Sequence, residues 1–206
     1  RHGGVMPASK TARQRAREDI TAEILAAARA RLAQAGPGEL SLRAVARDVG
    51  MVSSAVYRYF PSRNELLTAL LIAAYDDLGE AAEAADEAVA DRDDYLGRWT
   101  AVCNATREWS VAHPHDYALL YGSPVPGYAA PQDTVGPATR VIVRLVAVIV
   151  AAHQAGAASP VAPPNAPAGM DKTVAGAIDF VKDRGIPAKA DLPEITARKG
   201  GEPIVM

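Results

Sequence analysis

Cysteine is almost missing from this sequence: among 206 residues, only Cys103 is a cysteine. A single cysteine excludes an intramolecular disulfide framework and suits a reducing cytoplasm, where we expect the protein to reside. Runs of β-branched residues are also few, whereas alanine is abundant and apolar residues recur with a helical period. With 49% hydrophobic residues, the chain can bury a substantial core. These features predict an all-α protein.

Segments that could enter a membrane are scarce as well. The most apolar run, residues 141–152, carries Arg144 and is shorter than the ~20 residues that a spanning helix needs. No signal-peptide pattern is visible near the N-terminus. We therefore expect no membrane partner. Residues 1–5, which read RHGGV, precede Met6, and we expect the native chain to start at that methionine.

The residue sets that catalysis or metal binding needs are also lacking. His113 and His115 could ligate a metal, but no cysteine or carboxylate cluster completes a site at a familiar spacing. A loop followed by a helix start explains this pair better. The stretch 91–94 lacks the glycine and the terminal glutamate of a calcium loop. Since there is neither a nucleophile–base pair nor a phosphate-binding loop, we expect no catalytic residue, no metal and no cofactor.

Charge divides the chain into two unequal parts. Residues 1–63 contain 11 Lys/Arg and 5 Asp/Glu, a net charge of +6, while residues 64–206 contain 11 and 19, a net charge of −8. A basic first third suggests a module that binds a polyanion. An ordinary solvated basic segment would have the same composition, so charge alone leaves both readings open.

The first third has the periodicity of three consecutive helices. The spacing predicts a helix over 13–35, with an apolar stripe at four-residue intervals and a stop at Gly36. A second helix begins after Ser41, a natural N-cap, and closes at Gly50. Ser53, three residues later, can cap a third. Two short helices joined by a glycine-containing turn are typical of a helix-turn-helix.

The third helix has two distinct faces. Val56 and Phe60, with Val52 at the entry, point toward the neighbouring helices, whereas Ser54 and Arg58 point away. Small hydrogen-bonding side chains and a guanidinium suit the base edges of a major groove, and the serine and tyrosine hydroxyls can bind phosphates. Pro61 then ends the helix, and Ser62 with Glu65 forms a capping box for the next one.

The ordered run LSLRAVARDVGMVSSAVYRYFPSRNELL resembles the TetR family of bacterial transcriptional regulators, and the likeness covers residues from about 17 to 78. The resemblance implies a homodimer that binds double-stranded operator DNA. A lysine is common in that family where this chain has Arg63, and arginine keeps the charge. For Tyr57 and Tyr59, the alternative to DNA contact is packing within the three-helix module. By resemblance, the positions that contact DNA are Ser41, Arg43, Ser53, Ser54, Ala55, Tyr57, Arg58, Tyr59 and Arg63.

The remaining residues are expected to form the regulatory half. Periodicity predicts helices over 63–90, 94–112 and 136–154, a short one from Pro114, and a final one over 171–184 after a proline-rich linker. The segment WSVAHPHDYALLYGSPVPGYAAPQDTVGPATRV resembles the C-terminal domain of one TetR branch. The family usually ends with two long helices that pair between subunits. Only one clear helix follows the linker here, so the sequence does not place the dimer interface.

We therefore expect three parts: a basic arm over residues 1–16, a helix-turn-helix domain over 17–63, and a regulatory domain for ligand binding and dimerisation over 64–206. Aromatic residues concentrate in the third part, where they form either core or a ligand cavity. Cys103 reads as buried filler. Arg140 and Arg144 could meet an acidic ligand, or Glu108 or Asp116 could neutralise them. The candidate ligand-binding residues are Trp99, Cys103, Trp109, Tyr117 and Tyr121.

Two functions fit these patterns. The favoured one is a transcriptional repressor that leaves a palindromic operator when a small apolar effector binds. The alternative is a helical ligand-binding protein or an enzyme that does not act on DNA. The missing catalytic sets weigh against an enzyme.

Overall fold

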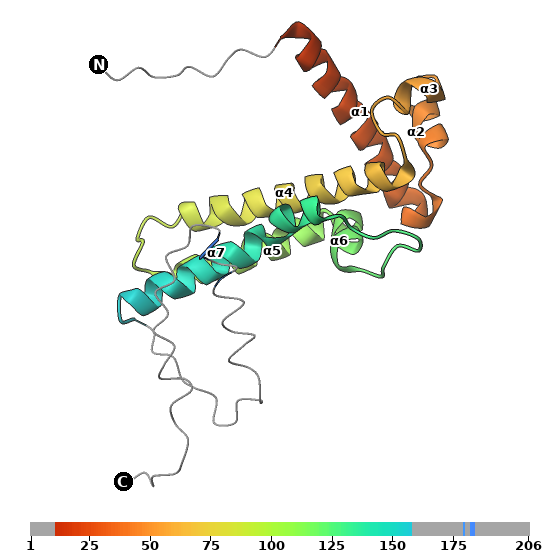
Figure 1. Cartoon of the computed structure of the whole chain (residues 1–206). Helices are drawn as coiled ribbons and strands as arrows, with labels where there is room; N and C mark the ends of the chain where they lie inside the picture. Colours follow the sequence, from red (N-terminus) through yellow and green to blue (C-terminus); the bar gives the residue numbers. More distant parts are fainter. Residues whose placement is uncertain (1–10, 158–178, 180–181, 184–206) are drawn as a thin grey trace, which may run out of the picture. The chain divides into compact units, whose positions relative to one another are not determined.

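The computed structural model describes residues 11–157, 179, 182 and 183 (Figure 1). Over these residues every regular element is helical, which confirms the predicted all-α class. In chain order the elements are α1 (Ala12–Ala35), η1 (Pro37–Glu39), α2 (Leu42–Asp48), α3 (Ser53–Val56), α4 (Arg63–Glu87), α5 (Tyr95–Ala112), α6 (Pro114–Tyr121), η2 (Gln132–Thr134) and α7 (Val135–Gln154). The predicted helix over 171–184 falls largely outside the described residues.

The chain packs as two compact units. Of the described residues, unit 1 takes in those up to Gly79 together with Glu108–Ala138, and unit 2 takes in Glu80–Arg107 together with those from Thr139. Both α4 and α5 therefore contribute to each unit. The domain boundary predicted at residue 63 divides the chain by expected function, and it does not coincide with the division into packing units. The functional boundary stays a prediction.

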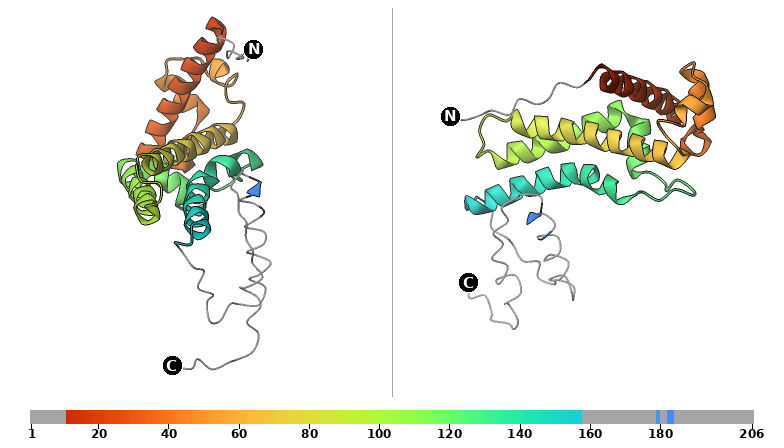
Figure 2. Two further views of the ribbon diagram at one scale, coloured as in Figure 1. Left: turned by 90° about the vertical axis from the view of Figure 1, so that its left-hand side faces the viewer. Right: turned by 45° about the horizontal axis from the view of Figure 1, so that its top comes forward.

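Unit 1 contains the three-helix module, in which α2 and α3 lie beside the C-terminal half of α1 (Figures 1 and 2). The apolar stripe expected on α1 is buried. Burial of each large apolar side chain stabilises the folded state by about 1.5–3 kcal/mol. The first turns of α4 close the same core. Its buried members are Ile24, Ala28, Leu32, Leu40, Leu42, Val45, Ala46, Val56, Phe60, Leu66, Leu67 and Leu70.

Local caps explain where the helices of unit 1 begin and end. The Thr11 side chain accepts a hydrogen bond from the Gln14 backbone N–H, and the Gln14 side chain accepts one from the Thr11 N–H, so α1 starts one residue before its expected position. Gly36 ends α1 with φ 74°, and Gly50 ends α2 with φ 65°, both in the left-handed region that favours glycine. Ser62 Oγ accepts from the Glu65 N–H at 3.1 Å, which confirms the predicted cap of α4.

The third helix is shorter than the pattern suggested, and one of its expected contacts is wrong. After four residues the backbone continues as turns through Tyr59. Val52 is the N-cap residue of α3 and is 70% exposed, so it does not pack beneath Val56 as expected. Ser53 is the first helical residue rather than the cap. Ser41 does occupy the N-cap of α2, although its side chain makes no capping hydrogen bond.

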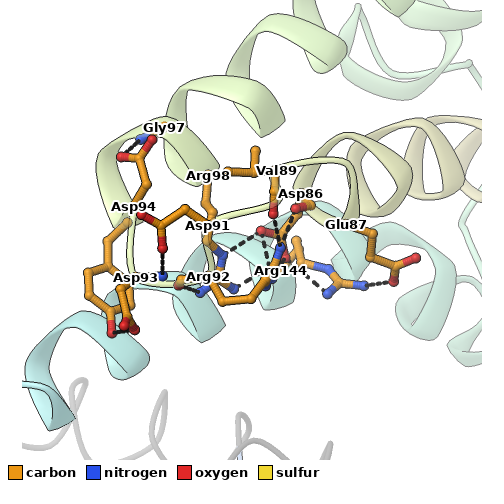
Figure 3. Close-up of polar contacts among 11 residues, drawn as sticks. Asp86, Glu87, Val89, Asp91, Arg92, Asp93, Asp94, Gly97, Arg98 and Arg144 are labelled. Carbon is orange, nitrogen blue, oxygen red and sulfur yellow. Dashed lines mark hydrogen bonds and ion pairs between the residues drawn. The ribbon is translucent and has the colours of Figure 1, made fainter.

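Unit 2 is held together around a buried carboxylate, that of Asp86 near the end of α4 (Figure 3). Arg98 of α5 donates to both carboxylate oxygens, from Nε at 2.7 Å and from a terminal nitrogen at 3.3 Å. Arg92 and Arg144 add further hydrogen bonds at 3.1 Å. We call Asp86, Arg92, Arg98 and Arg144 the Asp86 cluster. It joins α4, the α4–α5 connection, α5 and α7.

The arginines of α7 have partners other than those expected. Arg140 pairs with Glu83 at 2.7 Å, and Arg144 pairs with Asp86 and with Glu87 at 3.1 Å. Neither Glu108 nor Asp116 is the neutralising partner. Asp116 instead meets Arg29 of α1 at 3.3 Å within unit 1. Spacing along the sequence did not reveal these pairs, because the partners lie 57 or 58 residues apart.

The expectation that no apolar segment is long enough for a bilayer is corrected. The helical stretch Gln132–Gln154 has 23 residues and contains an 18-residue window with a mean hydropathy of 1.9, which meets the length and composition of a spanning helix. It was missed because α7 begins at Val135 and so continues the helix ahead of the apolar run over 141–152. Length and composition alone are weak evidence for a membrane span, and Arg140 and Arg144 of this helix pair with carboxylates of unit 2.

Candidate nucleic-acid interface

The polar face of α3 and the turn after it is exposed on a rigid support. Ser54 and Arg58 are exposed, and Tyr57 is 42% exposed. On the other face, Val56 is fully buried and Phe60 is 7% exposed, so they anchor the segment to the core. The outward set thus combines a hydroxyl, a phenol and a guanidinium, all of which can hydrogen-bond to bases or phosphates.

Cations extend this face onto α2. Arg43 is exposed, and so is Arg47 one turn later, as the helical pattern predicts for side chains four residues apart. Arg47 was not among the predicted contact residues. In the described part of the chain, Arg43, Arg47 and Arg58 take part in no ion pair. Their charges therefore remain available to an external anion.

One nearby cation is already neutralised. Arg31 of α1 donates to both carboxylate oxygens of Asp48 at the end of α2, one of them at 2.7 Å. The hydrogen bond from Arg31 lowers the pKa of the exposed Asp48 carboxyl below its ordinary value. This pair links α1 to α2, and the cationic face is left to Arg43, Arg47 and Arg58, which take part in no salt bridge among the described residues.

Two of the predicted contact residues are less exposed than Ser54, Tyr57 and Arg58, and their role in DNA contact stays a prediction. Ala55 is only 7% exposed, which argues against a role of its side chain in DNA contact. Tyr59 packs against the core cluster, and the Arg17 guanidinium lies over its ring at 5.0 Å from the centroid. The packing alternative therefore describes Tyr59 better. The exposed part of the Tyr59 ring positions the Arg17 guanidinium of α1 through this cation–π contact.

Arg63 is held by backbone carbonyls. Its Nε donates to the Leu40 carbonyl at 3.1 Å, and a terminal nitrogen donates to the Pro37 carbonyl at 2.6 Å. The side chain is half-buried and ties the start of α4 to the segment between α1 and α2. Arg63 therefore supports the three-helix module, in addition to the phosphate contact that the sequence suggested. The spacing of residues 37, 40 and 63 in the sequence did not reveal this supporting role.

The candidate ligand-binding residues are divided between the two units. Trp109, Tyr117 and Tyr121 lie in unit 1, and Trp99 and Cys103 lie in unit 2. Cys103 is exposed, so its reading as buried filler is wrong. It occupies a polar side of α5, whereas its neighbour Val102 is fully buried.

Within unit 1 the aromatic residues form a local cluster. The Tyr117 and Tyr121 rings are 5.0 Å apart between centroids, and Tyr121 meets Tyr75 of α4 edge-on at 6.1 Å. Burial raises the pKa of Tyr75 and of Tyr121, because it disfavours the phenolate. Tyr75 was not predicted, since only the fold brings α4 beside α6. Trp109 is buried and stacks on His113, whose backbone caps α6 as the helix-start reading of that histidine implies.

In unit 2, Trp99 lines an open surface depression of about 420 Å³ between the beginning of α5 and the last turns of α7. No group of three histidine, cysteine or carboxylate side chains within the described residues is arranged to hold a metal ion.

Comparison with known proteins agrees with the helix-turn-helix architecture. Residues 24–70 match the model of bacterial regulatory proteins of the tetR family, and residues 99–198 match the tetracyclin repressor-like C-terminal domain. HTH-type transcriptional regulators of Mycobacterium bovis and Mycobacterium tuberculosis, Mb1846 and Rv1816, are 54% identical over 134 residues. Each match covers 63% of this chain and 56% of the relative, so the chain matches little more than half the length of these proteins.

Solved structures show the same likeness. The protein SCO4313 is 35% identical with a TM-score of 0.61, over 81% of this chain and 72% of its own. A protein of unknown function from Rhodococcus sp. RHA1 is 26% identical with a TM-score of 0.59, over 93% of both chains. Two domain models in the expected order, together with these relatives, establish that the chain belongs to the TetR family of bacterial regulatory proteins.

Proposed function

We propose that the protein is a DNA-binding transcriptional regulator that acts as a repressor. The observation that carries the proposal is the exposed face of α2, α3 and the following turn, where Arg43, Arg47 and Arg58 take part in no salt bridge among the described residues. A rigid core behind this face keeps its side chains in fixed positions. The face thus has both the charge and the hydrogen-bonding groups that duplex DNA requires.

The chain would bind its operator as a homodimer and in the cytoplasm. Two-fold symmetry fits a helix-turn-helix protein, because each subunit can place one α3 segment in a major groove. The names of the mycobacterial relatives, which describe transcriptional regulators of the HTH type, support this assignment and weigh against an enzyme.

A small-molecule effector would control DNA binding. The candidate residues of unit 1, Trp109, Tyr117 and Tyr121, and those of unit 2, Trp99 and Cys103, stay proposals for effector contact. An effector can shift the equilibrium only by its preference for one conformation, typically about 1–3 kcal/mol. Linkage then requires operator DNA to weaken effector binding by the same factor.

A salt titration with random duplex DNA tests the core of this proposal. If the dimer neutralises about six phosphates, log K falls against log salt with a slope near −5. The double variant Arg43→Gln/Arg47→Gln should show a smaller slope on every sequence. Arg107→Gln removes the same kind of charge from an exposed position in unit 2 and serves as the control. Binding that does not respond to salt would rule out the proposed phosphate contacts.

A further inference from the structure

The short helix α6 turns a carboxylate, rather than an apolar side chain, toward the interior of unit 1. Of its eight residues, all of which the structure describes, only Asp116 is buried, and it is 5% exposed. A buried carboxylate is costly unless a cation pairs with it. In the described part of the chain, Arg29 of α1 is that cation, with its Nε 3.3 Å from an Asp116 oxygen. The charge of Asp116 is therefore compensated only while α6 lies against α1.

Arg29 has a second carboxylate partner, and this partner is exposed. A terminal nitrogen of Arg29 donates to Asp77 of α4 at 3.2 Å, and the Asp77 side chain is 48% exposed. One guanidinium therefore joins α1 both to α4 and to α6. Because exposed ion pairs contribute little whereas a buried charge must keep its partner, the contact with Asp116 constrains α1 more strongly than the contact with Asp77.

The residues that follow in the chain extend this attachment. We call residues 114–131 the α6 segment. Its apolar members Leu119, Val125 and Tyr128 pack against the core of the three-helix module. The Tyr128 hydroxyl also shares a hydrogen bond of 2.9 Å with the Thr68 hydroxyl in the first turns of α4. All of these residues belong to unit 1, so the α6 segment completes the core that supports α3.

The ion pair and the apolar contacts constrain the module in different ways. Apolar contacts are non-directional, so the packing of α1 against α4 and the α6 segment allows small rotations of α1. The pair between Arg29 and Asp116 joins one point on α1 to one point on α6, and a charge-assisted contact of this kind has a defined geometry. It therefore limits the rotations that the apolar contacts allow.

We infer that Asp116 is a positioning residue for DNA binding, although its buried side chain does not face the exposed surface of α2 and α3. Through Arg29 it holds α1, and with α1 the two helices packed on it, in the orientation that base contacts need. Such contacts require positions held to within about 0.5 Å, whereas attraction to phosphates falls off only gradually with distance. The effect on DNA rests on the proposed function. The attachment of α6 to α1 does not.

The first test removes one carboxylate partner of Arg29 at a time in the full chain. Asp116→Asn leaves Arg29 paired with Asp77, so it releases α6 without leaving a buried charge. Asp77→Asn is the matched control, since it removes the exposed partner of the same guanidinium. The probes are the duplex that the unaltered protein selects from a random-sequence library and a scrambled duplex of the same composition. Titrations at one salt concentration give the ratio of the two affinities.

This ratio distinguishes positioning from stability. We expect Asp116→Asn to lower it about tenfold and Asp77→Asn to change it by less than about twofold. A loss of stability alone would reduce the folded fraction and would affect both duplexes equally, so the ratio would not move. An unchanged ratio in Asp116→Asn, or equal losses in the two variants, would overturn the inference.

A double variant tests whether the two residues act as a pair. Arg29→Gln/Asp116→Asn should give the ratio of Asp116→Asn alone to within about twofold, because the second substitution removes a partner that is already lost. A further loss of about tenfold would mean that Arg29 acts on DNA independently of Asp116, and the inference would be wrong. Since the double variant also leaves no buried charge, it takes the place of Asp116→Asn if the single variant does not fold.

Hydrogen exchange separates this inference from the proposed function. The backbone amides of α6 should exchange faster in Asp116→Asn than in Asp77→Asn, because α6 has then lost its ion pair with α1. Equal protection of α6 in the two variants would refute the attachment, whatever the DNA result. If the unaltered protein selects no duplex, the regulator proposal fails and the positioning role falls with it, while the exchange rates still decide whether Asp116 holds α6 to α1.

Discussion

The arginines at the start of the molecule differ in what surrounds their guanidinium groups. Arg58 follows α3 on its exposed side and has no acidic partner in the described part of the chain. Arg63 stands five residues later, and its guanidinium donates to the Pro37 and Leu40 carbonyls. The first can form new hydrogen bonds with DNA at little cost, whereas the second would have to give up contacts that hold the module together. Substitutions at the two positions should therefore have different effects.

Replacing Arg58 with alanine should reduce specific DNA binding. A bidentate contact of arginine with a base is worth about 1–3 kcal/mol, so affinity for the operator should fall by that amount and affinity for random DNA much less. Gel-shift titrations on both duplexes at one salt concentration measure the difference. Equal losses on the two would identify Arg58 as a phosphate contact.

Arg63→Lys should lower stability while leaving the charge in place. A lysine has one ammonium group and cannot form the fork that reaches both carbonyls, and hydrogen bonds to charged groups are worth about 1.5–3 kcal/mol. Since Arg63 is only half-buried, we expect the free energy of unfolding in urea to fall by about 1–2 kcal/mol. Arg43→Lys is the matched control on an exposed helix face. An unchanged stability with a smaller salt slope would mean that the side chain serves DNA alone.

At the scale of helices, the Asp86 cluster shows how unit 2 is assembled from segments distant in sequence. Asp86 is fully buried, and its carboxylate receives hydrogen bonds from three arginines on different segments. Burial alone would raise the pKa of Asp86, but the hydrogen bonds from Arg98 and Arg92 outweigh it and place the pKa below its ordinary value of 3.8. The ionised form is therefore the one that joins α4, α5 and α7.

This direction of the pKa shift predicts how stability depends on pH. A carboxyl with a lowered pKa in the folded state contributes stability that is present above its unfolded pKa and is lost as pH falls through the folded value. Asp86→Asn should cost about 3 kcal/mol at pH 7, since it leaves arginines beside a neutral group. It should also make the melting temperature less sensitive to pH below about 4.

Glu87→Gln provides the control for Asp86→Asn. Glu87 is exposed and pairs with Arg144, and an exposed pair is worth about 0–1 kcal/mol. Thermal unfolding from pH 2 to pH 7 measures both variants. An acid transition of the same steepness in wild type and Asp86→Asn would show that other carboxylates dominate it, with Glu83 the first candidate because its hydrogen bond to Arg140 also lowers its pKa.

At the scale of the whole molecule, α4 is one of the helices that both packing units share. Its first turns close the core of the three-helix module in unit 1, and Asp86 in its last turn is the centre of the cluster in unit 2. A continuous helix transmits displacement along its axis, because its backbone hydrogen bonds resist local bending. This continuity is a physical basis for the proposed coupling between effector and operator.

Symmetry of the assembly predicts the form of the operator. If two subunits each place one α3 segment in successive major grooves, the half-site centres lie about 34–36 Å apart on unbent DNA. Footprinting should then protect an inverted repeat on one face of the duplex, and light scattering should give the mass of a dimer bound to it. A footprint without two-fold symmetry, or a monomer in the complex, would contradict the proposed assembly.

The sequence alone determined the local features of this protein. The stops at Gly36 and Gly50, the cap at Ser62, the order of the helices and the family resemblance all depend on residues within a few positions of one another. Because helix periodicity and capping are local, the helix bounds agreed closely with expectation along α1, α4 and α7. The exposed face with Ser54 and Arg58 followed from the same periodicity.

Tertiary structure decided the features that depend on contacts between distant segments. Ala55 is buried, whereas Cys103 is exposed. Arg63 donates to backbone carbonyls, and Asp86 accepts hydrogen bonds from three arginines. None of these features follows from the spacing of residues in the sequence. Trp99 and Ile149, which are 50 residues apart in the chain, likewise line one surface depression only in the folded protein. Which side of a helix becomes covered depends on the elements that pack against it, and the energy of a buried charge depends on every group that reaches it. Those relations exist only once the chain has folded.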